Sequence, residues 1–305
     1  MNIEVRSERP GDEEAIELVN CQAFRSMGEA NLVGLVRRII PTFDRRFSIT
    51  AWDGDRMVGH ALFTPARIRL LGETVPALAV GPVAVVPSHQ KQGIGQAVLK
   101  FGHDLGRREG FSLAFLVGHP SYYPRVGYKA CFGSAKVTID AEKLPKPSQT
   151  LTPRPVRPAD VPWLVERFAV EWADVDFAWL RGNSLAEWTF PGTNAVMWQT
   201  ADDKRAGYTL ASAEAKKLKI LLADDSAMAR DIIATVQPTS LEHHPAGWLA
   251  REALEAAWSS AEAKRGEHAM AVALQDGALD PLIDAVESGS RPSGSCNWPI
   301  PFMLC

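Results

Sequence analysis

Cysteine is scarce in this chain of 305 residues, which has four, and none stands in the paired spacing of a zinc site or a disulfide framework. Long hydrophobic runs are also missing, because no stretch of about eighteen apolar residues occurs. The first residues lack the basic-then-apolar order of a signal peptide. These absences argue against metal-ligand, disulfide-rich and membrane-spanning classes and predict a cytoplasmic protein with reduced thiols.

A strong charge of either sign is absent as well. The chain has 33 Lys and Arg against 36 Asp and Glu, a net charge of −3, and no dense basic stripe of the kind that binds nucleic acid. Hydrophobic residues at 46% and charged residues at 23% are typical of a soluble globular protein. The length is sufficient for two hydrophobic cores, so we expect two domains.

Proline marks the expected boundary between the two domains. Prolines at positions 145, 147, 153, 155 and 158 disfavour regular helix and predict an extended connector. Net charge changes across this connector, from +4 over residues 1–150 to −7 over residues 151–305. The sequence therefore predicts a first domain over 1–142, a linker over 143–158 and a second domain over 159–305.

The most informative segment is an apolar strand ending at Val86, a polar loop with two glycines, and a helix over 94–108. Gly93 and Gly95 let backbone amides approach an anion closely, and the helix N-terminus adds unpaired N–H groups and a positive dipole end. The spacing matches neither the phosphate loop of nucleotide triphosphatases nor the dinucleotide fingerprint. We expect a phosphorylated ligand of another kind.

The elements around this loop alternate in a recognisable order. Hydrophobic periodicity predicts a strand over 3–6, helices over 12–24 and 32–40, and four strands over 47–52, 57–63, 67–71 and 75–86. Glycine-containing turns at 53–55 and 71–73 join these strands in hairpins. A strand over 111–117 follows the helix. That helix is expected to bury Ile94, Ala97, Val98, Phe101 and Leu105 and to expose Gln96, Lys100, His103 and Arg107.

Two motifs carry a resemblance to a known family. Gln90-x-x-Gly93-x-Gly95 and Tyr123-x-x-x-Gly127-Tyr128 resemble the acetyl-CoA pyrophosphate loop and the Tyr-x-x-x-Gly-Phe turn of the GNAT N-acetyltransferase superfamily. The resemblance covers roughly residues 1–140. Within the superfamily, the segment Gly-His-Pro-x-Tyr-Tyr-Pro-Arg at 118–125 is similar to that of bacterial predicted acetyltransferases of the YhbS type.

The resemblance implies a fold, a cosubstrate and a set of contacts. The fold is the α/β GNAT acyl-CoA N-acyltransferase fold, a mixed and mostly antiparallel sheet with helices on both faces. The cosubstrate is acetyl-CoA, with no metal, and the acceptor is a primary amine of a small molecule or a peptide. The residues that the resemblance implies for cofactor binding are Val83, Ala84, Val85, Gln90, Lys91, Gln92, Gly93, Ile94, Gly95 and Gln96.

Amide formation requires groups that move protons. The resemblance assigns Tyr123 as the catalytic acid that protonates the departing thiolate. Alternatively, Tyr123 is only an aromatic wall of the site, or Tyr122 is the residue that faces inward. Many relatives carry a glutamate before the loop, but residues 78–86 contain no acid. The general base therefore stays open between a water chain, Glu29, His119 and a group from the second domain.

The second half is predicted to be a degenerate GNAT-like domain, with an unrelated α+β domain as the alternative. Its order is a helix over 161–170, a strand over 217–222, a helix over 246–264, a strand over 269–274 and a helix over 279–286. Its counterpart of the loop is expected at 238–247, with a single glycine, and should not hold a second CoA. His243 and His244 are expected in an exposed loop. The acids Glu171, Asp174 and Asp176 either attract a cationic acceptor or face water.

Two functional hypotheses follow. The first is an N-acetyltransferase that moves the acetyl group of acetyl-CoA to a primary amine by direct transfer. The second is a non-catalytic sensor or scaffold protein that binds acyl-CoA. Neither requires nucleic acid or a membrane, and a homodimer is left open.

Overall fold

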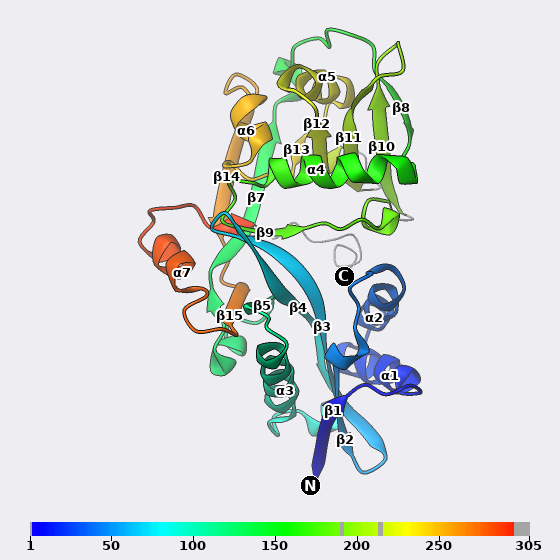
Figure 1. The fold of residues 1–305 in the computed structure, drawn as a ribbon, viewed down its shortest axis with the longest axis vertical. Helices are drawn as coiled ribbons and strands as arrows, with labels where there is room; N and C mark the ends of the chain where they lie inside the picture. The colour runs from blue at the N-terminus through cyan, green and yellow to red at the C-terminus, as the bar shows by residue number, and fades with distance from the viewer. Residues whose placement is uncertain (1, 190–191, 213–215, 296–305) are drawn as a thin grey trace.

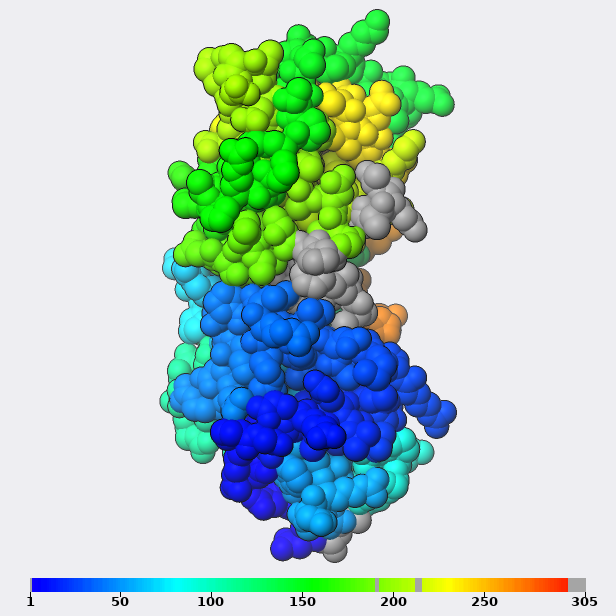
Figure 2. Space-filling model, turned by 90° about the vertical axis from the view of Figure 1, so that its right-hand side faces the viewer, coloured from blue at the N-terminus to red at the C-terminus, as the bar shows by residue number. Residues whose placement is uncertain are grey.

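The computed structural model describes residues 2–189, 192–212 and 216–295. The molecule is elongated and has two lobes, each built on an eight-stranded sheet (Figure 1). Figure 2 shows that N-terminal residues, in blue, form much of one lobe, whereas green and yellow residues from the middle of the chain form the other. In the described ranges, every helix is too short or too polar to cross a bilayer.

The first half follows the expected order of elements. They are β1 (Ile3–Ser7), α1 (Glu13–Phe24), α2 (Gly28–Ile39), β2 (Ser48–Asp53), β3 (Arg56–Leu70), β4 (Glu73–Val85), α3 (Ile94–Arg108) and β5 (Leu113–Val117). The helix predicted over 94–108 is confirmed with those bounds. The strands expected over 57–63 and 67–71 are instead one strand, β3. Its pairing with β4 continues through the segment between them, where Pro65 lies opposite Leu78.

Helix α3 buries most of the face expected, with Ile94 and Val98 inside and Gln96, Lys100 and Arg107 exposed, but the buried face is shifted toward its glycines. Its sheet-facing residues include Gly102 and Gly106, and a Cβ added at Gly102 would lie 2.2 Å from the ring of Phe63. Only glycine permits this close packing, so the helix turns its small residues inward. His103, expected outside, is 4% exposed, and Ala97, expected inside, is exposed.

The remaining elements build most of the second lobe. They are β6 (Lys129–Ala130), β7 (Phe132–Ile139), β8 (Thr152–Pro155), α4 (Val161–Glu171), β9 (Phe177–Leu180), β10 (Thr193–Gln199), β11 (Arg205–Ser212), β12 (Lys217–Ala223), α5 (Ser226–Val236), β13 (Ser240–Leu241), α6 (Trp248–Glu252), β14 (Ser259–Arg265), β15 (Ala269–Ala273), α7 (Asp280–Glu287) and β16 (Gly294–Ser295).

The second sheet repeats the plan of the first. In the first sheet, β1, β2, β3, β4 and β5 are neighbours in that order. In the second sheet, β8, β10, β11, β12 and β13 are neighbours in the corresponding order. In both sheets the last pair, β4 with β5 and β12 with β13, is parallel. The ion pair between Arg6 and Asp12 also recurs as Arg154 and Asp160, at N–O distances of 2.6 and 2.7 Å. The second half therefore repeats the fold of the first half, as expected.

Two details of that second half were predicted wrongly. The helix expected over 246–264 is the short α6 followed by strand β14, because residues 259–265 pair with β7 along its whole length. The counterpart of the phosphate loop is not at 238–247. It is the short connection from β12 to α5, which holds Asp224 and Asp225.

Strands cross between the lobes on both sides of the expected linker. β15 lies between β5 and β6 in the first sheet, and β9 pairs with β3 there. β7, from before the linker, lies in the second sheet beside β14 and β13. Figure 1 shows the long strand β3 reaching up to β9 at the base of the second lobe. The division at 143–158 stays a prediction, and the two sheets do not separate at it.

Candidate active site

A cleft opens in the first sheet where β4 and β5 diverge. The two strands pair only at Ala77–Ala79 with Leu113–Phe115. Beyond this point β4 continues beside β3 to Val85, whereas β5 pairs with β15. The β3–β4 register also shifts near the divergence, between Ala61 and Phe63, as at a β-bulge. The peptide groups of β4 that face away from β3 are thus left available to a ligand.

The loop after β4 ends at the N-terminus of α3. Gly93 has φ of +84° and precedes the helix, and Ala97 is the first residue whose amide bonds back, to the Gly93 carbonyl at 3.0 Å. The amides of residues 93–96 have no acceptor among the described residues. Four free N–H groups and the positive dipole end together make an anion site. Lys91, with φ of +62°, adds a cationic side chain at this loop.

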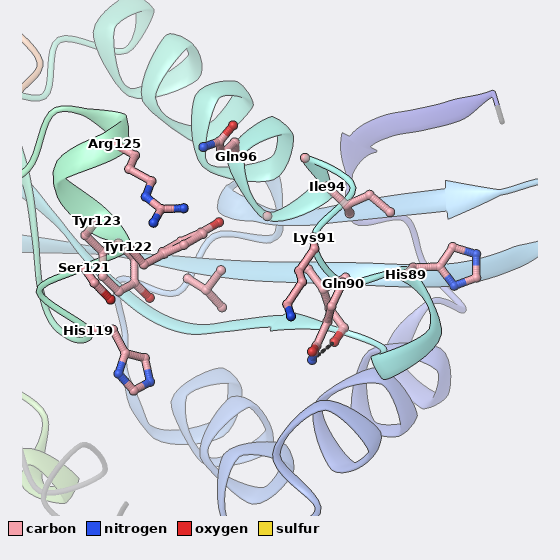
Figure 3. Close-up of a pocket in the computed structure, with 14 residues that line it drawn as sticks. His89, Gln90, Lys91, Ile94, Gln96, His119, Ser121, Tyr122, Tyr123 and Arg125 are labelled. Atoms are coloured by element: carbon pink, nitrogen blue, oxygen red, sulfur yellow. Dashed lines mark hydrogen bonds between the residues drawn. The ribbon is translucent and has the colours of Figure 1, made fainter.

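The cleft and the loop form one cavity of about 840 Å³. Figure 3 shows its lining, with Gln90 and Lys91 extending from the loop and Tyr122 and Arg125 reaching in from the turn after β5. Eight of the ten residues expected to bind the cofactor line it; Ala84 and Gln92 do not. Ala84 is buried in the core, and the Gln92 amide donates to the Ser88 carbonyl at 3.2 Å.

Two tyrosines face each other at the inner end of the cavity. The rings of Tyr122 and Tyr123 meet edge to face, with centroids 5.1 Å apart. Burial, with a smaller contribution from Tyr122, raises the pKa of Tyr123 to about 12, and burial also raises the pKa of Tyr122. Neither hydroxyl has a hydrogen-bond partner in the described part of the chain. Both phenols therefore stay protonated near neutral pH and are free to donate.

The Tyr122 side chain crosses the mouth of the phosphate loop. A Cβ built on Gly95 would lie 2.3 Å from the Tyr122 hydroxyl, so this hydroxyl packs against Gly95 in the first turn of α3. Tyr123 instead packs against Gly118, where an added Cβ would be 2.2 Å from its ring. Glycine is thus required at position 95 for the close approach of Tyr122, and at position 118 for that of Tyr123.

Glu29 and His119, the two named residues among the candidates for the general base, differ in position. His119 is exposed and lines the cavity. Glu29 lies in the first turn of α2, outside that lining, and one of its carboxylate oxygens is buried with no hydrogen-bond partner among the described residues. The lining itself contains no Asp or Glu.

Sequence reasoning missed the residue that anchors the loop. The His89 ring receives or donates hydrogen bonds on both sides, with Ser88 Oγ 2.8 Å from Nδ1 and Asp53 Oδ2 3.4 Å from Nε2. Asp53 belongs to the β2–β3 hairpin, so this contact ties the start of the loop to a neighbouring turn. The spacing of 36 residues carries no local signal, and only the fold brings the two together.

The corresponding place in the second lobe is filled by the chain itself. Asp225 caps α5 through the Met228 amide at 2.8 Å, and Trp163 Nε1 donates to Asp224 at 2.7 Å. The guanidinium of Arg205 lies over the Trp163 ring at 4.4 Å. Two carboxylates at this helix N-terminus disfavour a phosphate by charge repulsion.

The three acids predicted either to attract a cationic acceptor or to face water all have partners within the chain. Asp174 pairs with Arg251, Asp176 with Arg291 at 2.7 Å, and Glu171 with His243 at 2.9 Å. The expectation that His243 and His244 lie in an exposed loop is wrong, because they are 3% and 1% exposed. The His244 ring bonds to the Ser293 carbonyl at 2.9 Å, and burial lowers its pKa. These groups stabilise the second lobe.

Comparison with known proteins decides the family. The family model described as "Acetyltransferase (GNAT) domain" matches residues 4–131. The uncharacterized N-acetyltransferase YjhQ of Escherichia coli is 30% identical over 122 residues, which cover 40% of this chain and 67% of that protein. The chain belongs to the GNAT superfamily of N-acetyltransferases. This GNAT match covers the lobe that holds the cavity.

Solved structures extend the GNAT likeness to both lobes. A probable N-acyltransferase from Enterococcus faecalis has a TM-score of 0.68 at 14% identity, over 92% of this chain and 74% of that one. A GCN5-related N-acetyltransferase from Kribbella flavida has a TM-score of 0.68 at 16% identity, over 91% and 73%. At this level of identity the likeness shows the fold alone. In the described residues, no group of three or more His, Cys, Asp or Glu could hold a metal ion.

Proposed function

We propose that this GNAT protein is an N-acetyltransferase that moves the acetyl group of acetyl-CoA directly to a primary amine. The observation that carries the proposal is the single cavity that joins free helix N-terminal amides to two protonated tyrosines. One end fits the pyrophosphate of CoA. The other end fits a thioester whose departing sulfur needs a proton.

Each wall of the cavity then has a role. The amides of residues 93–96, with Lys91, hold the pyrophosphate by charge-assisted hydrogen bonds. The peptide groups of Val83–Val85 hold the pantetheine amides and the acetyl oxygen, as an added strand would be held. The Gln90 amide, which donates to the Val85 carbonyl at 3.1 Å, releases that carbonyl when the ligand arrives.

The proton balance is simple. The neutral amine attacks the acetyl carbonyl carbon, a C–N bond forms and the C–S bond breaks. Tyr123 donates its hydroxyl proton to the leaving sulfur, and the proton that the amine loses passes to solvent or to a base and restores the phenol. Tyr122 is the alternative donor. No acid in the lining is available as the base, so His119 or a water chain serves.

A thiol-release assay tests the proposal. Purified protein is mixed with acetyl-CoA and a panel of polyamines, amino-acid amides, peptides and aminoglycosides, and acetylated products are identified by mass spectrometry. We expect thiol release that depends on one class of amine. The mass of each acetylated amine should be about 42 mass units above that of the free amine, because an acetyl group replaces one hydrogen. Failure of the protein to bind CoA at all would overturn the proposal.

One observation favours a second candidate, a non-catalytic acyl-CoA sensor. The lining has no carboxylate, and residues 78–86 contain none either. A sensor would bind acetyl-CoA with calorimetrically measurable affinity, yet release no thiol with any amine of the panel. The same two measurements therefore separate the candidates.

A further inference from the structure

A second cavity, of about 450 Å³, lies along the outer side of α3. It shares Gln96 and Arg125 with the large cavity, so the two are contiguous at the first turn of the helix. Figure 3 shows the two residues, with Gln96 on the first turns of α3 and Arg125 on the turn after β5. A ligand whose phosphates rest on the helix N-terminus can extend between them.

Positive charge gathers in this second cavity. Asp104 accepts from Lys100 at 2.8 Å and from Arg107 at 2.8 Å, so one carboxylate is shared by two cations. Arg125 lines the cavity and has no ion pair among the described residues. His103 is neutral, because burial lowers its pKa to about 4. Three cations against one carboxylate leave two positive charges without a counter-ion.

We infer that this cavity binds the 3′-phosphate on the ribose of CoA, with Arg125 and Lys100 as its ligands. This inference rests on the proposed function, because it assumes that the pyrophosphate lies on residues 93–96. The pantetheine arm then leads inward to the tyrosines, and the ribose must leave outward. A phosphate monoester carries close to two negative charges near neutral pH, which matches the surplus in the cavity. Asp104 opposes an anion by itself, but its two bonds orient Lys100 and Arg107.

The other way out of the large cavity passes Lys91, on the far side of the loop. That side offers one cation, and the Lys91 side chain extends from the loop away from α3 (Figure 3). The α3 side offers a cavity of about 450 Å³ and three cations. Charge and shape therefore favour the passage between Gln96 and Arg125.

Isothermal titration calorimetry with CoA and dephospho-CoA tests the inference, because the two ligands differ only in the 3′-phosphate. We expect the wild-type protein to bind CoA at least about tenfold more tightly than dephospho-CoA at low salt, with the ratio decreasing as ionic strength rises. Arg125→Gln and Lys100→Gln should each reduce the ratio severalfold and leave dephospho-CoA binding within about twofold. Arg108→Gln is the matched control, since Arg108 is exposed in the last turn of α3 and lines neither cavity.

Equal affinity of the wild-type protein for the two ligands would overturn the inference and leave the proposed function standing. So would a ratio that Lys91→Gln abolishes and Arg125→Gln does not, or an Arg125→Gln protein that weakens both ligands equally. Binding of neither ligand would count against the proposed function itself. The variants change exposed side chains, and thermal unfolding checks that each is folded.

Discussion

The Nε2 atom of His103 lies 2.9 Å from the hydroxyl oxygen of Tyr128, and both side chains are buried. Tyr128 in turn packs edge-on against Tyr123, with ring centroids 5.6 Å apart. The hydrogen bond therefore connects α3 to the turn that carries the proposed acid. Tyr128 stands where the motif Tyr-x-x-x-Gly-Phe has phenylalanine, which has no hydroxyl and would not form this bond.

The first prediction concerns this pair. Tyr128→Phe leaves the buried His103 nitrogen without a partner and should lower the free energy of unfolding by about 1–3 kcal/mol. His103→Leu combined with Tyr128→Phe replaces both polar groups by apolar ones and should recover most of that loss. Urea unfolding of the wild type, both single variants and the double variant measures the coupling. A Tyr128→Phe protein as stable as the wild type would contradict the expectation.

The second prediction is a loss of stability in mild acid. Burial lowers the pKa of His103 to about 4 and that of His60 to about 3, from 6.5. As the pH falls, these histidines therefore take up protons in the unfolded chain before they do so in the folded one. Their effect on the free energy of unfolding is absent above about pH 6.5 and lowers that free energy progressively as the pH falls toward 4. Between pH 7.5 and 5.5 each histidine should cost about 1.4 kcal/mol.

The control for this pH effect is the same double variant. His103→Leu with Tyr128→Phe should lose about 1.4 kcal/mol less than the wild type over that interval, since one of the buried histidines is gone. Urea unfolding at the two pH values gives the difference. An identical pH dependence for the two proteins would show that His103 is not neutral in the folded state.

The third prediction separates the two tyrosines. Tyr123→Phe should lower kcat about ten- to a thousandfold with little change in the KM for acetyl-CoA, because it removes a proton donor and keeps the ring. Tyr122→Phe is the matched variant and should keep most of kcat. Because the pKa of Tyr123 is raised to about 12, kcat should show no loss from its ionisation below about pH 10. Reversal of the two kcat effects would make Tyr122 the donor.

The fourth prediction concerns the glycines of the loop. Gly95→Val places a Cβ where the Tyr122 hydroxyl lies, and Gly93→Val forces a branched side chain into a φ of +84°. Each should weaken CoA binding more than about tenfold. Gly110→Val is the control, because Gly110 has φ of +81° with nothing within 4 Å and lies beyond the far end of α3. Calorimetry on folded Gly95→Val protein with unchanged affinity would exclude this loop as the phosphate site.

The fifth prediction concerns truncation. A fragment that ends at Pro147 loses β15, which covers the edge of β5, and β9, which pairs with β3. We expect it to be unfolded or aggregated and to bind no CoA, and separate fragments 1–147 and 148–305 should regain binding only when they are expressed together. Circular dichroism and calorimetry are the measurements. A folded fragment 1–147 that binds CoA would show that the first sheet is stable without the later strands.

How far the sequence predicts this molecule depends on how local each signal is. The bounds of α3 follow from a glycine at its start and a clear helical period. The repeat is also present in the sequence, as Arg-x-x-Arg-Pro-x-Asp at 6–12 and again at 154–160. In the structure the first arginine of each motif bonds to its aspartate, Arg6 to Asp12 and Arg154 to Asp160.

Other features depend on partners distant in sequence. Residues 259–265 are rich in Ala, Glu and Lys, which favour helix, yet they form a strand because β7 offers an edge more than 120 residues away. Likewise, the inward turn of His103 follows from the glycines that let α3 approach Phe63. Tertiary packing decides such cases, and single-sequence periodicity does not report it.

The order in which strands enter the first sheet has a consequence for synthesis on the ribosome. Residues 113–117 of β5 emerge about 150 residues before β15, the strand that completes their edge. N-terminal domains commonly fold while the rest of a chain is still being made. Here the nascent chain must instead carry an open, apolar β5 edge while about 150 further residues are made, which is an aggregation risk. The sheet on the β5 side of the cleft is thus completed only after residues 269–273 have been released.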